Sequence, residues 1–340
     1  MTDGAAPLAR RGWWWPVLAV LGWFVVADLP IAQTLLPVHQ PLLLLVPMLA
    51  ACALAGWWKG GSMPMAISVT AAAAGLVFNV VRSGVSSDGL TAAWSMIAAS
   101  CLGLSLLATR SKRFLGTGVV AVLAALLLST LLVAAAPAGP VALSRTVTAV
   151  LEVRGNADLN NWRAARAQMT RASSTRADSA TTALLDRAEQ SVSALPLLAR
   201  SVLPSLLALQ TLVAMALAWA LFHRVSRTRL GEPLAPVREF RFNDQWIWSM
   251  IVGLVVALLP ALQELQPLGV NLLVFFGALY ALRGAAVLAW FLRPGRSLLG
   301  LLVGVALLLL LRESAAIALG LVGLGDTWAD WRRRTRPAVS

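Results

Sequence analysis

The chain contains few charged residues, histidines and cysteines. Only 13% of its 340 residues are charged, whereas a soluble domain has roughly 25%. The two histidines lie at loop edges, with no carboxylate or cysteine at metal-ligand spacing, so we expect no metal site and no cofactor. Both cysteines, Cys52 and Cys101, lie within apolar segments, which predicts buried free thiols and no disulfide framework.

Sequence motifs for catalysis are also missing. The chain has no H-E-x-x-H zinc motif, no G-x-S-x-G nucleophile elbow and no phosphate-binding glycine loop. Without a Walker sequence it cannot itself be an ATPase. Proteolysis within the membrane would need a matched pair of catalytic residues inside apolar segments, and we cannot assemble such a pair. We therefore expect no enzymatic activity and assign no catalytic residue.

Long apolar segments dominate the sequence. Hydrophobic residues make up 59% of the chain and its mean hydropathy is +0.76. Runs of about 18 or more apolar residues, each long enough to cross a bilayer, recur along it. We predict an all-α, polytopic membrane helix bundle of about eight or nine transmembrane segments with a small helical insertion on the outer face. The expected spans lie near residues 13–28, 41–58, 64–82, 90–108, 115–136, 202–222, 246–262, 269–292 and 298–324.

Four parts follow from this segmentation. They are a five-span membrane half (1–137), an extracytoplasmic helical segment (138–200), a membrane half of three to four spans (201–325) and a polar, basic tail (326–340). The first thirty residues resemble a signal peptide but lack an A-x-A cleavage site, so we interpret them as an uncleaved first transmembrane helix.

Two segments leave alternatives open. Residues 138–200 predict a pair of amphipathic helices lying on the outer face, either as a solvated connector or as a cap over a substrate path. Arg312 and Glu313 interrupt the last apolar stretch. Residues 298–324 therefore either cross once, with an ion pair, or form a hairpin that returns the tail to the cytoplasm, and we favour the hairpin.

The basic residues lie in alternate short loops. The short loops on the opposite side contain only Arg82, so the positive-inside rule predicts a cytoplasmic N-terminus in a bacterial inner membrane. The net charge of +13 accordingly points to anionic lipid at the cytoplasmic loops as a partner, and not to nucleic acid. The basic residues on the expected cytoplasmic side are Arg10, Arg11, Lys59, Arg110, Lys112, Arg113, Arg224, Arg227, Arg229, Arg238, Arg241, Arg293 and Arg296.

Arg283 is the candidate functional residue, because it lies inside the apolar segment "ALYALRGAAVLAWFL". An arginine at such a depth costs about 2.5–3.5 kcal/mol on insertion scales, so it should face the bundle interior or a wet cavity. We expect Glu313 to be its partner, with Glu264 and free carbonyl groups as alternatives. The polar residues expected to line the same region are Asn271, Tyr280, Asn79 and Gln210. The group is either a site for a polar or anionic ligand or a structural salt bridge between the last two segments.

Small residues repeat every four positions in two spans, and such stripes let helix backbones approach closely. The first stripe is Thr91, Ser95, Ala99 and Gly103, and the second is Gly277, Ala281 and Ala285. We expect both to be helix-packing surfaces.

Several segments resemble the YybS-like family, uncharacterised bacterial multi-pass membrane proteins classed as a domain of unknown function. The segments are "GWWKGG", "GLSLLATRSKRFLGTGVV", "RTRLGEPLAPVREFRFNDQWIW", "NLLVFFGALYALRGAAVLAWFL" and "GLGDTWADWRRR", and the resemblance extends over residues 13–335. The first six spans are similar in layout to the substrate-binding subunits of energy-coupling-factor vitamin transporters. That similarity implies association with a membrane coupler and ATPase subunits. No vitamin-binding motif matches, so no ligand residue is carried over.

Two functions are therefore expected. The preferred one is a solute-binding or transport subunit without its own ATPase, with Arg283, Glu313 and Asn271 lining the site. The alternative is a non-catalytic membrane scaffold or assembly protein of the cell envelope, in which the loop at 223–245 docks partners. A wet cavity at Arg283 favours transport, whereas a dry ion pair favours the scaffold.

Overall fold

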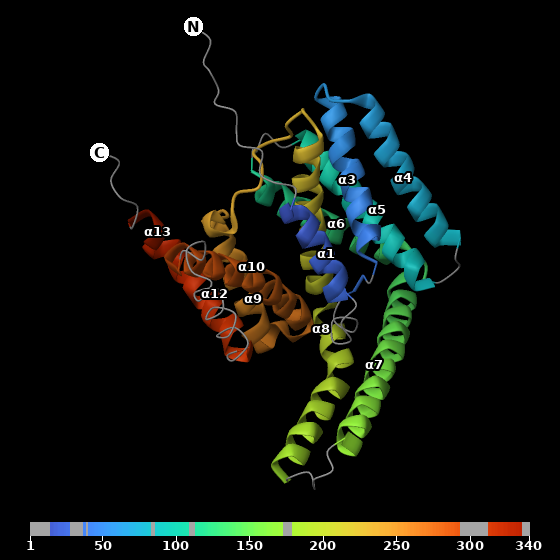
Figure 1. The fold of residues 1–340 in the computed structure, drawn as a ribbon, viewed down its shortest axis with the longest axis vertical. Helices are drawn as coiled ribbons and strands as arrows, with labels where there is room; N and C mark the ends of the chain where they lie inside the picture. Colours follow the sequence, from blue (N-terminus) through green and yellow to red (C-terminus); the bar gives the residue numbers. More distant parts are fainter. Residues whose placement is uncertain are drawn as a thin grey trace.

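The fold is described from a computed structural model, over residues 14–27, 37–38, 40–82, 86–108, 113–172, 179–292 and 312–334. These residues form α-helices and short 3-10 helices and contain no strand, so the predicted all-α polytopic helix bundle is confirmed (Figure 1). The elements are α1 (Trp14–Ala27), α3 (Pro41–Trp58), α4 (Met63–Arg82), α5 (Ser86–Ala108), α6 (Phe114–Ala135), α7 (Gly139–Ala172), α8 (Ser179–Val225), η1 (Val237–Glu239), η2 (Asp244–Trp246), α9 (Ile247–Leu258), η3 (Pro260–Leu265), α10 (Gln266–Leu292), α12 (Arg312–Ala329) and α13 (Trp331–Arg334).

The core of the N-terminal bundle lies around α3. Pro41 occupies the first turn of this helix, where its missing N–H costs nothing, and Gly60, with φ of 88°, takes the left-handed conformation just after the helix ends. Its side chains Leu44, Met48 and Cys52 are completely buried. They join one apolar core with residues of α5, α6 and the C-terminal half of α8.

Six described helices are long and apolar enough to cross a membrane. They are Pro41–Trp58, Met63–Arg82, Asp88–Ala108, Phe114–Ala135, Thr182–Val225 and Pro260–Phe291. The spans expected at 246–262 and 298–324 correspond to shorter apolar helices, Asp244–Leu258 and Ser314–Ala329. Residues 298–311 of the last expected span lie outside the described residues.

The outer segment forms a helical hairpin. α7 and the N-terminal half of α8 run side by side and project from the bundle (Figure 1), whereas we expected them to lie along its face. The two helices contact each other through both apolar and charged residues. Pro196 of α8 lies against Gly155 of α7, and Arg166 of α7 pairs with Asp186 and Glu189 of α8 at 2.7 and 2.8 Å. α8 is a single 47-residue helix, so the boundary expected at residue 200 falls within it.

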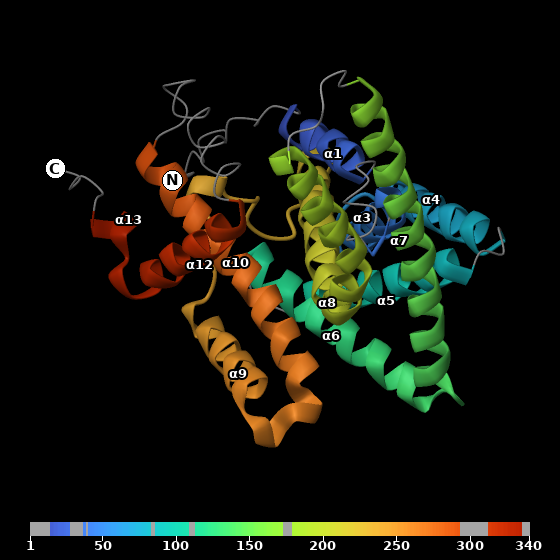
Figure 2. The same ribbon diagram turned by 90° about the horizontal axis from the view of Figure 1, so that it is seen from below.

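The C-terminal helices form a separate group beside α8 (Figure 2). α9 packs against the first half of α10, where Gly253 and Gly269 bring the two backbones together. α12 packs against the second half of α10. Because α9 has only 12 residues, the loop before it reaches along α10 to the level of Arg283.

Candidate functional site

Arg283 is enclosed by carboxylates from two other elements. Its Nε donates to Asp326 Oδ2 on α12 at 3.0 Å, and its Nη2 donates to the main-chain oxygen of Asp326 at 3.3 Å. Its Nη1 donates to Asp244 Oδ1 on η2 at 2.5 Å. The exposed fractions are 2% for Arg283 and 0% for Asp326, whereas the side chain of Asp244 is 59% exposed. Each of the three guanidinium nitrogens thus has a hydrogen-bond partner within the protein.

A second buried arginine shares the same carboxylate. Arg332 on α13 donates from Nη2 to Asp326 Oδ2 at 2.7 Å and from Nη1 to the carbonyl oxygens of Arg238 and Phe240 at 3.2 and 2.9 Å. Asp330, with φ of 41°, makes the turn that brings Arg332 back toward Asp326. Asp326 therefore lies between two guanidinium groups, and we call Arg283, Asp326, Arg332 and Asp244 the ionic cluster.

Aromatic side chains of the loop between α8 and α9 cover the ionic cluster. The ring of Phe242 lies 5.0 Å from that of Tyr280 and 5.6 Å from the guanidinium carbon of Arg283. Trp246 stacks on Phe276 at 5.4 Å. These contacts place apolar rings beside the ion pairs, where a low local dielectric strengthens them.

Two glycines set the distance between α10 and α12. A Cβ on Gly284 would overlap the carbonyl oxygen of Leu319, and a Cβ on Gly323 would overlap the carbonyl oxygen of Tyr280. The backbones are therefore in contact, as small residues at helix crossings allow. This crossing lies beside Arg283 and brings Asp326 within hydrogen-bonding distance of it.

The expected partner of Arg283 was Glu313, but the carboxylates that bind it are Asp326 and Asp244. The side chain of Glu313 lies outside the described part of the structure. Its backbone lies in the first turn of α12, about 20 Å along the helix axis from Asp326 at 1.5 Å per residue. The same final segment supplies the partner, but from its other end. Glu264, the alternative partner, is exposed in η3.

Asn271 does not line the Arg283 region, although Tyr280 does. Asn271 joins α10 to α8: its Oδ1 accepts from the Ser205 N–H at 3.0 Å and hydroxyl at 2.6 Å, and its Nδ2 donates to the Ser201 carbonyl at 2.8 Å. Its Nδ2 also donates to the Pro267 carbonyl at 2.8 Å, so all the hydrogen-bonding groups of its amide are engaged.

The other two polar candidates also lie elsewhere. Gln210 on α8 is buried, and it binds the backbone N–H and carbonyl of Val38 at 3.1 and 2.6 Å. Asn79 on α4 is exposed and donates to the Gly75 carbonyl of its own helix at 2.9 Å.

The two small-residue stripes differ in their surroundings. On α5, Ser95 and Ala99 are buried, Thr91 is half-buried, and a Cβ on Gly103 would lie 3.8 Å from the Cβ of Ala51 on α3. On α10, the members Gly277, Ala281 and Ala285 are half-buried. Nothing lies within 4 Å of a Cβ placed on Gly277, so the tight crossing of α10 uses Gly284 instead.

Three residues of the cluster were not predicted from the sequence: Asp326, Arg332 and Asp244. All three lie in segments read as polar termini or loops, "GLGDTWADWRRR" and "RFNDQW". The available signal was that both segments combine aspartate with tryptophan next to an apolar helix. Such residues can fold back onto a buried arginine.

The ionic cluster offers little for chemistry. No group of three or more His, Cys, Asp or Glu in the described ranges could hold a metal ion. Oδ2 of the buried Asp326 carboxylate is occupied by two arginines, whereas its Oδ1 is buried and has no hydrogen-bond partner among the described residues. The arrangement therefore suits holding three segments together better than acid–base work.

Comparison with known proteins agrees with the membrane architecture. Residues 31–327 match the family described as "Predicted membrane protein (DUF2232)", a description that names no activity, ligand or partner. No curated protein and no solved structure matches the chain. The matched stretch covers most of the sequence and includes Arg283, Asp244 and Asp326. The chain is thus a multi-pass membrane protein and belongs to the DUF2232 family.

Proposed function

We propose that the protein is a non-catalytic scaffold or assembly protein of the cell envelope, embedded in the bacterial inner membrane. The observation that carries the proposal is the surrounding of Arg283. Two carboxylates bind this side chain and it is 2% exposed, so it does not line an open polar cavity. A solute-binding role for Arg283 would require such a cavity, as ligand sites are concave with a few convergent polar groups.

The proposal places the loop and the C-terminal segment on the cytoplasmic side. Arg241 pairs with Asp330, and Arg332 binds the carbonyl groups of Arg238 and Phe240, so both segments lie on one face of the molecule. Both are rich in arginine, which the positive-inside rule associates with the cytoplasm. Exposed arginines here would meet anionic lipid, at about 1 kcal/mol each.

The α7–α8 hairpin supports a scaffold role on the other side. α7 has 34 residues, which corresponds to about 51 Å at 1.5 Å per residue. Ion pairs between Arg163 and Glu189 at 2.9 Å, and between Arg166 and Asp186, join its two helices. Because α8 continues without a break into the bundle core, a partner bound to the hairpin would be held at a fixed position relative to the membrane.

Site-specific cross-linking in intact cells tests the proposal. A photo-reactive residue replaces Arg187, which is exposed on the hairpin, or Phe78, which is 64% exposed on α4 and serves as the control. We expect one envelope protein to be captured from position 187 and not from position 78. Recovery of a membrane coupler, ATPase subunits and a stoichiometric solute, with no hairpin adduct, would instead establish a transport subunit.

A further inference from the structure

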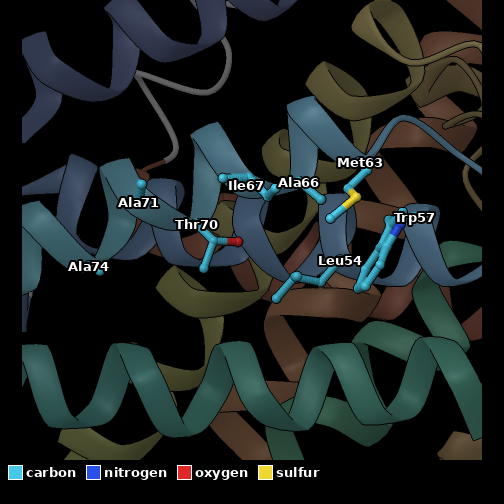
Figure 3. Close-up of a pocket in the computed structure, with 8 residues that line it drawn as sticks. All are labelled: Leu54, Trp57, Met63, Ala66, Ile67, Thr70, Ala71 and Ala74. Carbon is cyan, nitrogen blue, oxygen red and sulfur yellow. The ribbon is translucent and has the colours of Figure 1, made fainter.

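A groove runs along the α3–α4 hairpin, far in sequence from the ionic cluster. It has a volume of about 280 Å³ and is lined by Leu54 and Trp57 of α3 and by side chains between Met63 and Ala74 of α4 (Figure 3). Every lining side chain is apolar except that of Thr70. The groove therefore offers almost no group to a polar solute.

The groove opens toward lipid. Both of its walls are helices long and apolar enough to cross a membrane. α4 is at the periphery of the bundle, because only 17% of its apolar window is buried, against 67% for α3. Its lining residues Met63 and Ile67 are 52% and 57% exposed. In a bilayer, the surroundings of such a surface are hydrocarbon chains.

The length of the groove matches one leaflet. From Met63 to Ala74, α4 rises about 16 Å at 1.5 Å per residue, close to half of a hydrocarbon core that is about 30 Å thick. A single acyl chain that extends from the interface to the bilayer midplane would fill it.

One end of the groove has the features of a membrane interface. Trp57 lines this end, Trp58 beside it is 75% exposed, and Lys59 lies exposed in the turn between the two helices. Tryptophan and lysine are typical of the headgroup level. The Nζ of Lys59 donates to the Leu106 carbonyl at 3.0 Å, and an ammonium group has three N–H donors in all. Residues 40–82 contain no aspartate or glutamate, so Lys59 has no acidic neighbour within the hairpin itself.

We propose that this groove binds one acyl chain of an anionic glycerophospholipid, whose phosphate lies beside Lys59. The apolar walls contact the chain, and the charge of Lys59 selects an anionic headgroup over a zwitterionic one. The site is separate from the proposed scaffold function and holds whether or not that function is correct.

Thr70 is the one groove residue with a side-chain hydroxyl. Its Oγ1 is buried and has no hydrogen-bond partner in the described part of the chain, whereas Thr130 in α6 donates to the Leu126 carbonyl one turn back. A hydrocarbon chain offers no hydrogen bond to this hydroxyl. Thr70→Val should therefore leave lipid binding unchanged, and a loss of more than threefold would contradict an acyl-chain occupant.

The test is native mass spectrometry of the delipidated full-length protein after addition of phosphatidylglycerol or phosphatidylcholine with identical chains. We expect one phosphatidylglycerol to remain bound, and phosphatidylcholine to bind at least fivefold less. Ala71→Trp fills the groove and should reduce the bound lipid at least fivefold. Ala72→Trp, at an exposed neighbouring position outside the groove, is the matched control and should not. Lys59→Gln should remove the preference for phosphatidylglycerol.

A second measurement does not depend on how well the tryptophan variants fold. The protein and its Trp57→Phe variant are compared in vesicles whose lipids have brominated chains, and the difference in fluorescence is the contribution of Trp57. This contribution should be smaller in brominated phosphatidylglycerol than in brominated phosphatidylcholine, because a bound brominated chain already quenches Trp57. Equal quenching in the two lipids, equal binding of the two lipids, or a protein dimer that Ala71→Trp abolishes would each overturn the proposal.

Discussion

Arg283 on α10 and Asp326 on α12 form an ion pair of 3.0 Å in which neither side chain has appreciable contact with solvent. Such a pair contributes little net stability compared with apolar residues of the same size, because both charges must be desolvated. Removing only one partner is different, since the other is left buried and uncompensated. Asp326 also binds Arg332 at 2.7 Å, so the three side chains depend on one another.

Arg332→Lys should release the loop. The two Nη atoms of Arg332 reach Asp326 and two loop carbonyl groups at once, and a lysine ammonium cannot reproduce this planar, forked geometry. We expect trypsin to cleave after Arg238 and Arg241 several times faster in the variant. Arg334→Lys, at an exposed position of the same short helix, is the control. Equal cleavage rates in both variants would show that Arg332 does not hold the loop.

Gly284→Ala and Gly323→Ala should each destabilise the C-terminal group of helices. The added methyl groups would overlap backbone atoms, which cannot move as a side chain can, and overpacking of this kind costs about 1–3 kcal/mol. Gly277→Ala is the matched control, because nothing lies within 4 Å of its Cβ; it should be neutral or stabilise by about 0.5–1 kcal/mol. Thermal unfolding in detergent measures all three, and the same loss at Gly277 would argue against a specific crossing.

Asn271→Leu should weaken the contact between α8 and α10. The change removes the side-chain bonds to Ser205 and Ser201, and it leaves these polar groups of α8 without the amide as a partner. Interhelical hydrogen bonds in membranes contribute about 0.6 kcal/mol each, and up to about 1.7 kcal/mol. Asn79→Leu removes only a bond within α4 and should leave the melting temperature unchanged. If the two variants melt alike, Asn271 does not join the two helices.

Asp158→Asn should stabilise the hairpin in a pH-dependent way. Asp158 on α7 is 8% exposed, its Oδ2 has no hydrogen-bond partner among the described residues, and burial raises the pKa of this carboxyl. A raised pKa means that the folded state loses stability as pH rises above the unfolded value of about 3.9. The variant should therefore melt at a higher temperature at neutral pH, with the gain disappearing at about pH 4 or below.

The control for that prediction is Glu152→Gln on the same helix, because Glu152 is exposed. Thermal unfolding of both variants at neutral and acidic pH is the measurement. A gain that does not change with pH, or one that Glu152→Gln shares, would contradict a buried ionised carboxyl at position 158.

Much of the bundle could be predicted from local sequence. The expected spans at 41–58, 64–82, 90–108 and 115–136 agree with α3, α4, α5 and α6 to within a few residues. These segments are long and apolar, their lengths are close to what a bilayer requires, and turn residues in the sequence mark where they end. The turn between α3 and α4 is an example, since "KGG" contains the left-handed Gly60.

The geometry of the candidate site was only partly predictable. The cost of burying a guanidinium showed that Arg283 must have a partner, but the choice of Asp326 depends on how α12 crosses α10. A repeat at every fourth position identifies a stripe of small residues on a helix, but it does not show which face of that helix meets a neighbour. The crossing at Gly284 was therefore not predicted. The helical spacing within residues 138–200 predicted amphipathic helices, but not that the two helices would pair with each other as they do through Arg166 and Glu189.

A double-mutant cycle tests the central claim, that Arg283 is a structural residue held by Asp326. The free energy of unfolding is measured for Arg283→Leu, Asp326→Leu and the double variant, with Arg238→Leu as an exposed control worth at most about 1 kcal/mol. We expect each single change at the pair to cost about 3–5 kcal/mol, Asp326→Leu the more because two arginines lose their partner. The double variant should cost at least about 1 kcal/mol less than the sum of the two. Strictly additive losses, or an Arg283→Leu protein of unchanged stability that no longer retains a co-purifying solute, would contradict the account.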